Sequence, residues 1–222
     1  MSAPPIDPFH EQVVRVALKV ANRYGFVLGG GLALILHGAL QRPTEDIDLF
    51  GPESASVTTA AAAVREALQA AGVRVTEIPS DTDLGEVIDG MDYFMAELVA
   101  FPALGDEGAV RISLGHLDQA HTPVALDIGP VMAMEDLIAW KVVALISRAE
   151  VRDFVDVAAF LADRDIDSLL ALARRADPAL EEDDVAQAGA RLDETPDRVF
   201  APYALGPREI AQLRARFTAW PR

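Results

Sequence analysis

Two aspartates separated by one residue have the spacing in this sequence that most directly suggests chemistry. Asp46 and Asp48 lie in the alternating polar and apolar run Asp46-Ile47-Asp48-Leu49-Phe50, which predicts a β-strand. Side chains alternate between the two faces of a strand, so both carboxylates point to one face. Neighbouring carboxylates repel each other unless a cation lies between them, and Mg²⁺ prefers oxygen ligands and leaves room for phosphate. The pair indicates a magnesium site, with two solvated carboxylates on an edge strand as the alternative.

Three consecutive glycines precede this strand. Gly29, Gly30 and Gly31 follow a short apolar strand at Phe26-Val27-Leu28 and come directly before an apolar helix predicted from Leu32 to Ala39. Without Cβ atoms, backbone N–H groups can approach an anion, and the helix dipole favours negative charge. The glycines are therefore a candidate phosphate-binding turn, with a tight turn that needs positive φ as the alternative.

A lysine within an apolar helix is the third candidate. The segment from Leu137 to Ile146 is apolar nearly all round, which predicts a buried helix with Lys141 as its single cation. A buried ammonium needs a partner. Three alternatives remain open: a carboxylate such as Asp153 or Asp156, the phosphates of a nucleotide, or water reached along the lysine's alkyl stem. Arg152 lies four residues before Asp156 on the next predicted helix, where an ordinary ion pair between the two is one alternative.

Composition limits the other possibilities. The 222 residues are 51% apolar and 24% charged, as in a folded globular protein. The sequence has no cysteine, and its four histidines show no metal-binding spacing, so a metal would be held by carboxylates. The 35 acidic and 19 basic residues give a net charge of −16, which argues against a broad electrostatic contact with nucleic acid but allows a local basic groove. No apolar run is long enough to cross a membrane, so we expect a cytoplasmic protein.

These candidates must be positioned by an α/β front part and a helical back part. We predict a mixed α/β domain over residues 1–130 and a helical region packed on it over residues 131–222. The first predicted helix begins at Asp7-Pro8. The later predicted helices cover residues 56–71, 134–147, 152–162, 168–176, 184–192 and 207–220. The further predicted strands cover residues 73–78, 94–101, 110–114 and 124–128.

Several spaced motifs resemble a known family. The three glycines, followed by Arg42-Pro43-Thr44-Glu45-Asp46-Ile47-Asp48-Leu49, resemble the signature of the nucleotidyltransferase superfamily, in particular its AbiEii/AbiGii toxin-like branch. Lys141, followed by Arg152-Asp153-Phe154-Val155-Asp156, resembles the lysine and RD-x-x-D elements of that branch. The sequence has Gly30-Gly31 where the superfamily more usually has Gly-Ser, so Thr44 would supply a nearby hydroxyl.

The resemblance implies a fold, a reaction and a set of site residues. The fold would be α/β (α+β), a nucleotidyltransferase-like mixed sheet flanked by helices, with a helical C-terminal region. The reaction would move a nucleoside monophosphate from an NTP to an acceptor hydroxyl, with Mg²⁺ and release of pyrophosphate. Asp46, Asp48 and Asp127 would hold the metal, with Asp127 as the third carboxylate on a neighbouring strand and as the general base. Lys141 would be catalytic as well. The implied nucleotide-binding residues are Gly29, Gly30, Gly31, Arg42, Thr44, Lys141, Arg152 and Asp153.

The acceptor and the partners remain open at this point. The resemblance suggests a tRNA 3′ end or a protein hydroxyl as acceptor, and an antitoxin protein as partner. A tRNA acceptor fits the acidic balance if a basic face is formed by Arg65, Arg74, Arg148, Arg152, Arg174 and Arg175. One alternative is a small-molecule nucleotidyltransferase acting on cationic aminoglycosides, which suits the net charge of −16. Another is a catalytically idle domain that binds nucleotide or a partner protein.

Overall fold

The computed structural model describes residues 7–40, 44, 46–53, 56–78, 95–103, 105–203 and 205–222. The chain divides into two compact units, unit 1 at Met1–Ala133 and unit 2 at Met134–Arg222. The boundary predicted after residue 130 falls inside the last strand of unit 1. Each unit is described by itself below.

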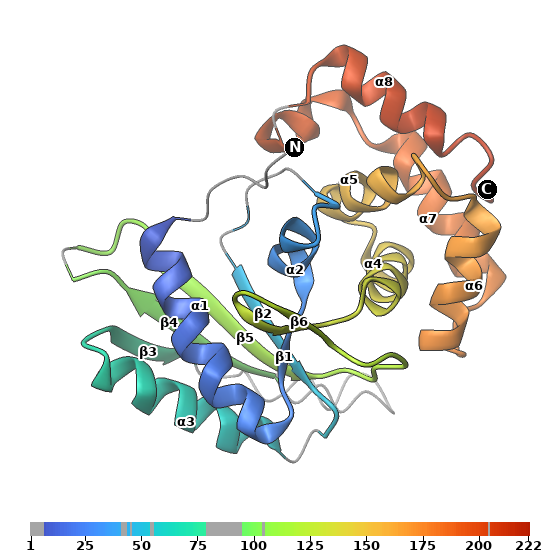
Figure 1. Ribbon diagram of the computed structural model, residues 1–222. Helices are drawn as coiled ribbons and strands as arrows, with labels where there is room; N and C mark the ends of the chain where they lie inside the picture. The colour runs from blue at the N-terminus through green and yellow to red at the C-terminus, as the bar shows by residue number, and fades with distance from the viewer. Residues whose placement is uncertain are drawn as a thin grey trace. The chain divides into compact units, whose positions relative to one another are not determined.

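Unit 1 is built on a seven-stranded mixed sheet (Figure 1). Its strands are β1 (Val27–Leu28), β2 (Asp46–Gly51), β3 (Arg74–Ile78), β4 (Met95–Phe101), β5 (Val110–His116), β6 (Val124–Leu126) and β7 (Gly129–Val131). Its helices are α1 (Pro8–Ala21), the 3-10 turn η1 (Asn22–Tyr24), α2 (Gly30–Leu36) and α3 (Val57–Ala70). The strand order is β3-β4-β5-β2-β1-β7-β6. β2 therefore lies inside the sheet, between β1 and β5.

Strand register places residues of distant segments in common rows. β2 and β5 are parallel, with Asp46 opposite Arg111 and Asp48 opposite Ser113. β4 is antiparallel to β5 and places Glu97 opposite Ser113. One row across three strands therefore contains Asp48, Ser113 and Glu97, and the row beside it contains Asp46 and Arg111.

Helices α1 and α3 cover one face of this sheet. They lie next to each other in Figure 1, and they contact strands β2, β4 and β5. The side chains on this covered face form the core; Ile47, Leu49, Leu98, Ile112 and Leu114 have no exposed surface. Asp7 starts α1 because its carboxylate accepts hydrogen bonds from the backbone N–H groups of Phe9 (2.9 Å) and His10 (3.2 Å).

The opposite face of the sheet carries the polar residues. We call it the aspartate face and define it by Asp46, Asp48 and Phe50 of β2, Arg111, Ser113 and Gly115 of β5, and Glu97 of β4. Asp46, Asp48, Phe50 and Glu97 are half-buried and Arg111 is exposed, whereas Ser113 and Gly115 are buried. The strand alternation predicted for β2 is confirmed, since its apolar residues are buried in the core and its carboxylates are accessible.

The strand predicted over 124–128 is wrong at its C-terminal end. β6 ends at Leu126, Asp127 and Ile128 form a turn, and the chain returns antiparallel as β7. Gly129, at φ 132°, adopts a backbone conformation that other residues rarely take, which allows this short hairpin. The apolar pattern that predicted one strand therefore continues through a hairpin.

Unit 2 is helical. It contains α4 (Met134–Arg148), α5 (Val151–Phe160), α6 (Ile166–Ala176), α7 (Glu182–Glu194), the 3-10 segment η4 (Asp197–Tyr203) and α8 (Pro207–Arg216). α4 is apolar nearly all round because it packs against α5, α6 and α7. Beyond α8 the chain returns to α7, where Trp220 Nε1 donates to the Val185 carbonyl (2.9 Å) and Arg222 binds the Asp193 carboxylate through two hydrogen bonds.

Candidate active site

The two aspartates of β2 lie on one accessible face of an internal strand. Ile47 and Leu49 are fully buried, whereas Asp46 and Asp48 are half-buried on the aspartate face. Two residues of extended chain separate their Cα atoms by about 7 Å. The alternative of an edge strand is wrong, because β2 pairs with β1 on one side and β5 on the other.

The glycine turn is built against the second aspartate. Gly30 has φ +63°, and a Cβ at this position would lie 1.8 Å from Asp48 Oδ2. A Cβ on Gly29 would lie 2.4 Å from the Phe50 ring, and the Gly29 N–H donates to the Asp48 carbonyl (2.8 Å). Glycine is therefore required at both positions by space, and at Gly30 by conformation as well. The turn that opens α2 and the Asp48 carboxylate share one small volume.

Two further residues of the predicted signature have separate outcomes. Arg42 lies outside the described residues, so its nucleotide-binding role stays a prediction. Thr44 is half-buried two residues before Asp46, and its role also stays a prediction.

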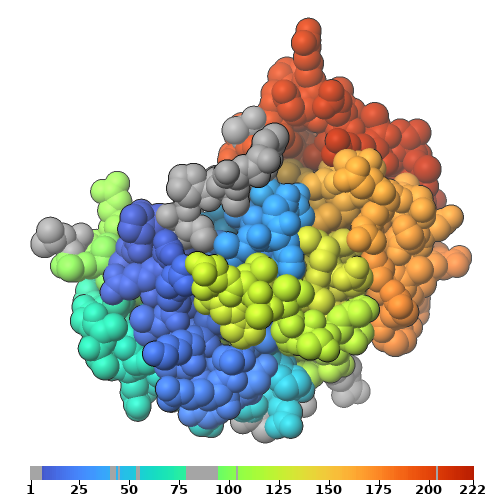
Figure 2. All heavy atoms as spheres, viewed as in Figure 1, coloured from blue at the N-terminus to red at the C-terminus, as the bar shows by residue number. Residues whose placement is uncertain are grey.

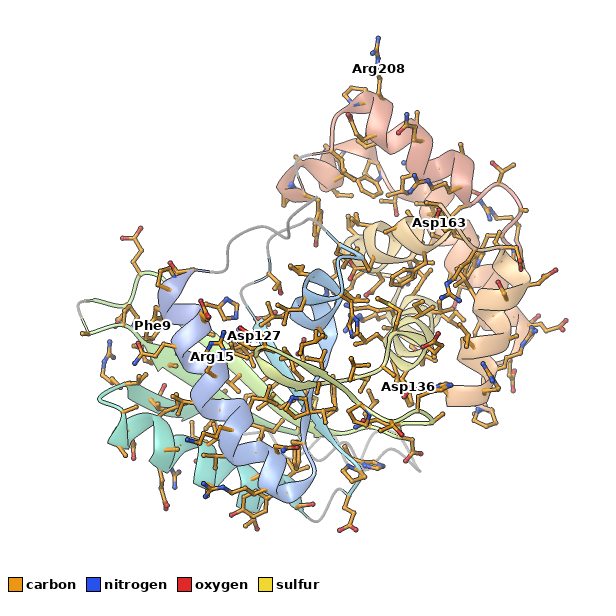
Figure 3. All side chains as sticks on the ribbon, in the orientation of Figure 1. Phe9, Arg15, Asp127, Asp136, Asp163 and Arg208 are labelled. Carbon is orange, nitrogen blue, oxygen red and sulfur yellow. The ribbon has the colours of Figure 1, made fainter. Side chains whose placement is uncertain are left out.

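The sequence predicts Asp127 on a strand beside that of Asp46 and Asp48, but the structure places it elsewhere. It lies in the turn between β6 and β7, and strands β1 and β7 separate β6 from β2 in the sheet. Its side chain is fully exposed, and Arg15 of α1 donates to its carbonyl (2.8 Å) and its carboxylate (3.4 Å). Figure 3 shows the two side chains pointing toward each other, and Figure 2 shows the hairpin lying against α1. Arg15 therefore links the hairpin to α1, and the metal-binding and general-base roles of Asp127 stay predictions.

The register brings other polar residues to the aspartate pair, which the sequence patterns did not single out. Ser113 is buried opposite Asp48, Glu97 continues the same row on β4, and Arg111 is exposed opposite Asp46. Among the described strands, Glu97 is the one further carboxylate on the aspartate face. The period-2 pattern of residues 110–114 marked a strand but contained no information about its neighbour.

In unit 2, Lys141 has a carboxylate partner. Its Nζ lies 2.9 Å from Asp156 Oδ2, the Asp156 side chain has no exposed surface, and that of Lys141 is 14% exposed. Of the three alternatives for this ammonium, the structure selects Asp156 as the partner within its unit. The ion pair joins α4 to α5, and breaking such a buried pair leaves an uncompensated charge.

The residues around Asp153 form the corner between α4 and α5. Asp153 is fully buried, and its carboxylate accepts two hydrogen bonds from the Arg148 guanidinium (2.9 and 2.8 Å) and one from the Glu150 N–H (3.2 Å). Glu150 and Asp153 also form a capping box at the start of α5. With this carboxylate buried and bonded at both oxygens, the geometry provides a helix corner rather than a direct contact with a nucleotide.

Arg152 does not form the ion pair with Asp156. Its Nε lies 2.8 Å from Glu150 Oε2, but without the alignment of a hydrogen bond, so the contact is an ion pair only. Asp156 faces Lys141 instead. Arg152 and Asp156 are four residues apart on α5, but the Asp156 carboxylate pairs with Lys141 of α4.

Five of the six arginines of the predicted basic face have acidic neighbours, whereas Arg175 of α6 is exposed and makes no hydrogen bond or ion pair within the described residues. In unit 1, Arg65 pairs with Glu77, and Arg74 pairs with Asp106 while lying over the Phe101 ring. In unit 2, Arg148, Arg152 and Arg174 pair with Asp153, Glu150 and Glu182. These arginines therefore offer little uncompensated charge for nucleic acid.

The donor set at the aspartate pair consists of oxygen. Across the described ranges, no group of three histidine, aspartate or glutamate side chains could hold a metal ion together. Two carboxylates suit Mg²⁺, which is commonly bound by one or two carboxylates together with water and substrate phosphates. The residues present therefore fit a magnesium ion that arrives with a phosphate ligand.

None of the described helices is long and apolar enough to span a membrane.

Comparisons with known proteins identify the family and the fold. The family model described as nucleotidyl transferase AbiEii toxin, of a type IV toxin–antitoxin system, matches residues 13–219. MenT4, a nucleotidyltransferase toxin of Mycobacterium tuberculosis, has a similar fold: the TM-score is 0.56 at 18% identity, covering 94% of this chain and 81% of that one. JHP933 of Helicobacter pylori is similar as well, with a TM-score of 0.55 at 16% identity, covering 94% and 88%. No curated protein sequence matches the chain.

The chain belongs to the AbiEii family of nucleotidyltransferase toxins, because the family model matches nearly its whole length. It is a nucleotidyltransferase. Its mixed seven-stranded sheet with flanking helices is the nucleotidyltransferase fold predicted from the motifs.

Proposed function

We propose that this nucleotidyltransferase transfers a nucleoside monophosphate from an NTP to a hydroxyl of tRNA, with Mg²⁺ held by Asp46 and Asp48, as the toxin of a toxin–antitoxin pair. The observation that carries the proposal is the packing of Gly30 against the Asp48 carboxylate. This packing gives an anion-binding turn and a metal-binding carboxylate access to the same ligand, as a Mg²⁺-bound triphosphate requires.

The glycine turn and the aspartate pair have different roles in the proposed reaction. The N–H groups at the start of α2 have no partner within the helix and bind phosphate oxygens. Asp46 and Asp48 hold the divalent ion, which supplies neutralisation of the charge that develops on the phosphates. The acceptor oxygen forms a bond to the α-phosphorus, the bond from that phosphorus to the β-phosphate bridging oxygen breaks, and pyrophosphate leaves. Positioning and charge neutralisation provide most of the catalysis in such transfers.

The proton of the attacking hydroxyl needs a carboxylate on the same face. Asp127 lies in the β6–β7 turn, and strands β1 and β7 separate β6 from β2. Glu97 lies in the row of Asp48, with Ser113 between them. We therefore assign to Glu97 the role of general base that the sequence resemblance had given to Asp127.

The family resemblance also links residues of unit 2 to the reaction. Lys141 carries the cation that the family resemblance links to the nucleotide's phosphates, and Asp156 holds its ammonium in place. Asp153 fixes the α4–α5 corner through Arg148, and Arg152 is paired with Glu150 at the start of α5.

A transfer assay tests the proposal. The purified protein is incubated with Mg²⁺ and each of the four α-labelled NTPs, with total tRNA or an aminoglycoside panel as acceptor, beside the Asp46→Ala/Asp48→Ala variant. Label moving to tRNA, and lost in the variant, supports the proposal. Label moving to an aminoglycoside assigns the protein to the antibiotic-modifying class instead. No transfer to either acceptor, with nucleotide still bound, favours a protein acceptor or an idle domain.

A further inference from the structure

One arginine of unit 1 lies on the strand directly beside the aspartate pair. Arg111 lies on β5 directly opposite Asp46, with Cα atoms about 4.8 Å apart across the parallel pair. Its side chain is exposed, between the buried residues Val110 and Ile112. Within the described part of the chain it makes no hydrogen bond or ion pair. The guanidinium is therefore available to a ligand that reaches the aspartate pair.

Three other described arginines of unit 1 are already engaged. Arg15 binds Glu11 and Asp127, Arg65 binds Glu77, and Arg74 binds Asp106. Unit 1 as a whole carries 18 acidic and 7 basic residues. Arg111 therefore adds a positive charge beside two carboxylates in an acidic unit, and this charge can attract an incoming phosphate to the aspartate face.

Strand β2 lies between this arginine on β5 and the glycine turn that follows β1. Gly30 approaches Asp48 from the side of β1, because α2 follows β1 directly. Arg111 stands on β5, on the other side of β2. If the triphosphate lies against the glycines, Arg111 is next to the opposite side of the aspartate pair, where the acceptor hydroxyl must approach to attack in line with the leaving pyrophosphate.

We propose that Arg111 is an acceptor-binding residue that contacts a phosphate group beside the reacting hydroxyl. A guanidinium matches phosphate oxygens with two parallel hydrogen bonds. The same positive charge repels a cationic aminoglycoside at this point. Arg111 thus selects acceptors that carry phosphate, which deepens the proposed function and rests on it.

Steady-state kinetics of the full-length protein test this role. The variants are Arg111→Ala and Arg111→Lys, and the control is Arg23→Ala, an exposed arginine of η1 beyond the helix that covers the opposite face. With total tRNA as acceptor, Arg111→Ala is expected to raise the KM for tRNA about tenfold or more. It should also reduce by about 1 the slope of log(kcat/KM) against log[salt]. Affinity for the NTP, measured by calorimetry, should match that of the wild type.

The outcomes separate this inference from the proposed function. Transfer by the wild type with an unchanged KM for tRNA in Arg111→Ala overturns the role of Arg111 alone. An equal loss of NTP affinity also overturns it, because it would place the arginine on the donor side. Transfer by the wild type to an aminoglycoside and not to tRNA overturns both proposals. Partial recovery of the KM for tRNA in Arg111→Lys supports a phosphate contact, because lysine keeps the positive charge but lacks the two parallel hydrogen bonds of a guanidinium.

Discussion

The chemistry-bearing residues of the two units are held in opposite ways. In unit 1, Asp46, Asp48 and Arg111 are half-buried or exposed on one face of a sheet, and like charges stand close together. In unit 2, Asp153 and Asp156 have no exposed surface, and each is matched by a cation from α4. Groups that bind a ligand must stay accessible at some electrostatic cost, whereas groups that hold helices together can be neutralised within the fold. We therefore expect substitutions in unit 1 to affect activity and those in unit 2 to affect stability.

The largest effect is expected from Asp48→Asn. Loss of a metal-binding charge should reduce nucleotidyl transfer about 1,000-fold, while the free energy of unfolding changes by no more than about 0.5 kcal/mol. Transfer kinetics and urea unfolding are measured on the same preparation. Glu66→Gln, an exposed carboxylate on α3, is the control and should leave both values unchanged. A large loss of stability in Asp48→Asn would remove the contrast between the units.

Lys141→Met should lower the free energy of unfolding by about 3 kcal/mol, because the fully buried Asp156 carboxylate loses the ammonium that lies 2.9 Å from it. The double variant Lys141→Met/Asp156→Leu removes both charges and should recover most of that stability. If Lys141 also contacts the nucleotide, the double variant unfolds like the wild type but does not transfer. Recovery of transfer along with stability would limit Lys141 to a structural role.

Gly30→Ala should lower the free energy of unfolding by about 2 kcal/mol, because it combines backbone strain at φ +63° with a Cβ that overlaps Asp48 Oδ2. Gly38→Ala is the matched control, because Gly38 has φ +76° with open space around its Cβ position. The difference between the two variants in urea unfolding isolates the overlap with the carboxylate. Equal losses would mean that the glycine turn and Asp48 are less tightly joined than the structure indicates.

The smallest effect is expected from the exposed pair between Asp193 and Arg222 in unit 2. The hydrogen bond from Arg222 lowers the pKa of Asp193. A carboxyl whose pKa is lowered by folding stabilises the protein above its unfolded pKa and loses that contribution as the pH falls through the folded pKa. Asp193→Asn should therefore lower stability at pH 7 by less than about 1 kcal/mol, as for exposed pairs. In acid, thermal unfolding should no longer distinguish this variant from the wild type.

Local patterns predicted most of the elements but not the contacts between them. The alternation in β2, the capping of α1 by Asp7 and the all-round apolar α4 depend on residues close in sequence, and the structure confirms them. The strand placement of Asp127 was wrong because one apolar run contained a hairpin turn. Glu97, Ser113 and Arg111 were missed because only the pairing of β2, β5 and β4 brings them to Asp48 and Asp46. The motifs located the aspartates and glycines, whereas their neighbours depended on non-local register.

The parallel pairing of β2 with β5 also has a consequence for how the enzyme is made. Asp46 and Arg111 are opposite each other although they are 65 residues apart in the chain, and pairings of such long sequence separation form slowly. During synthesis, the glycine turn and the aspartates leave the ribosome well before β5 does. Until β5 docks, β2 is an unprotected edge, and Arg111 and Ser113 are missing from its side. A nascent chain therefore contains the motif for nucleotidyl transfer before it contains a complete site, so transfer has to wait until β5 pairs with β2.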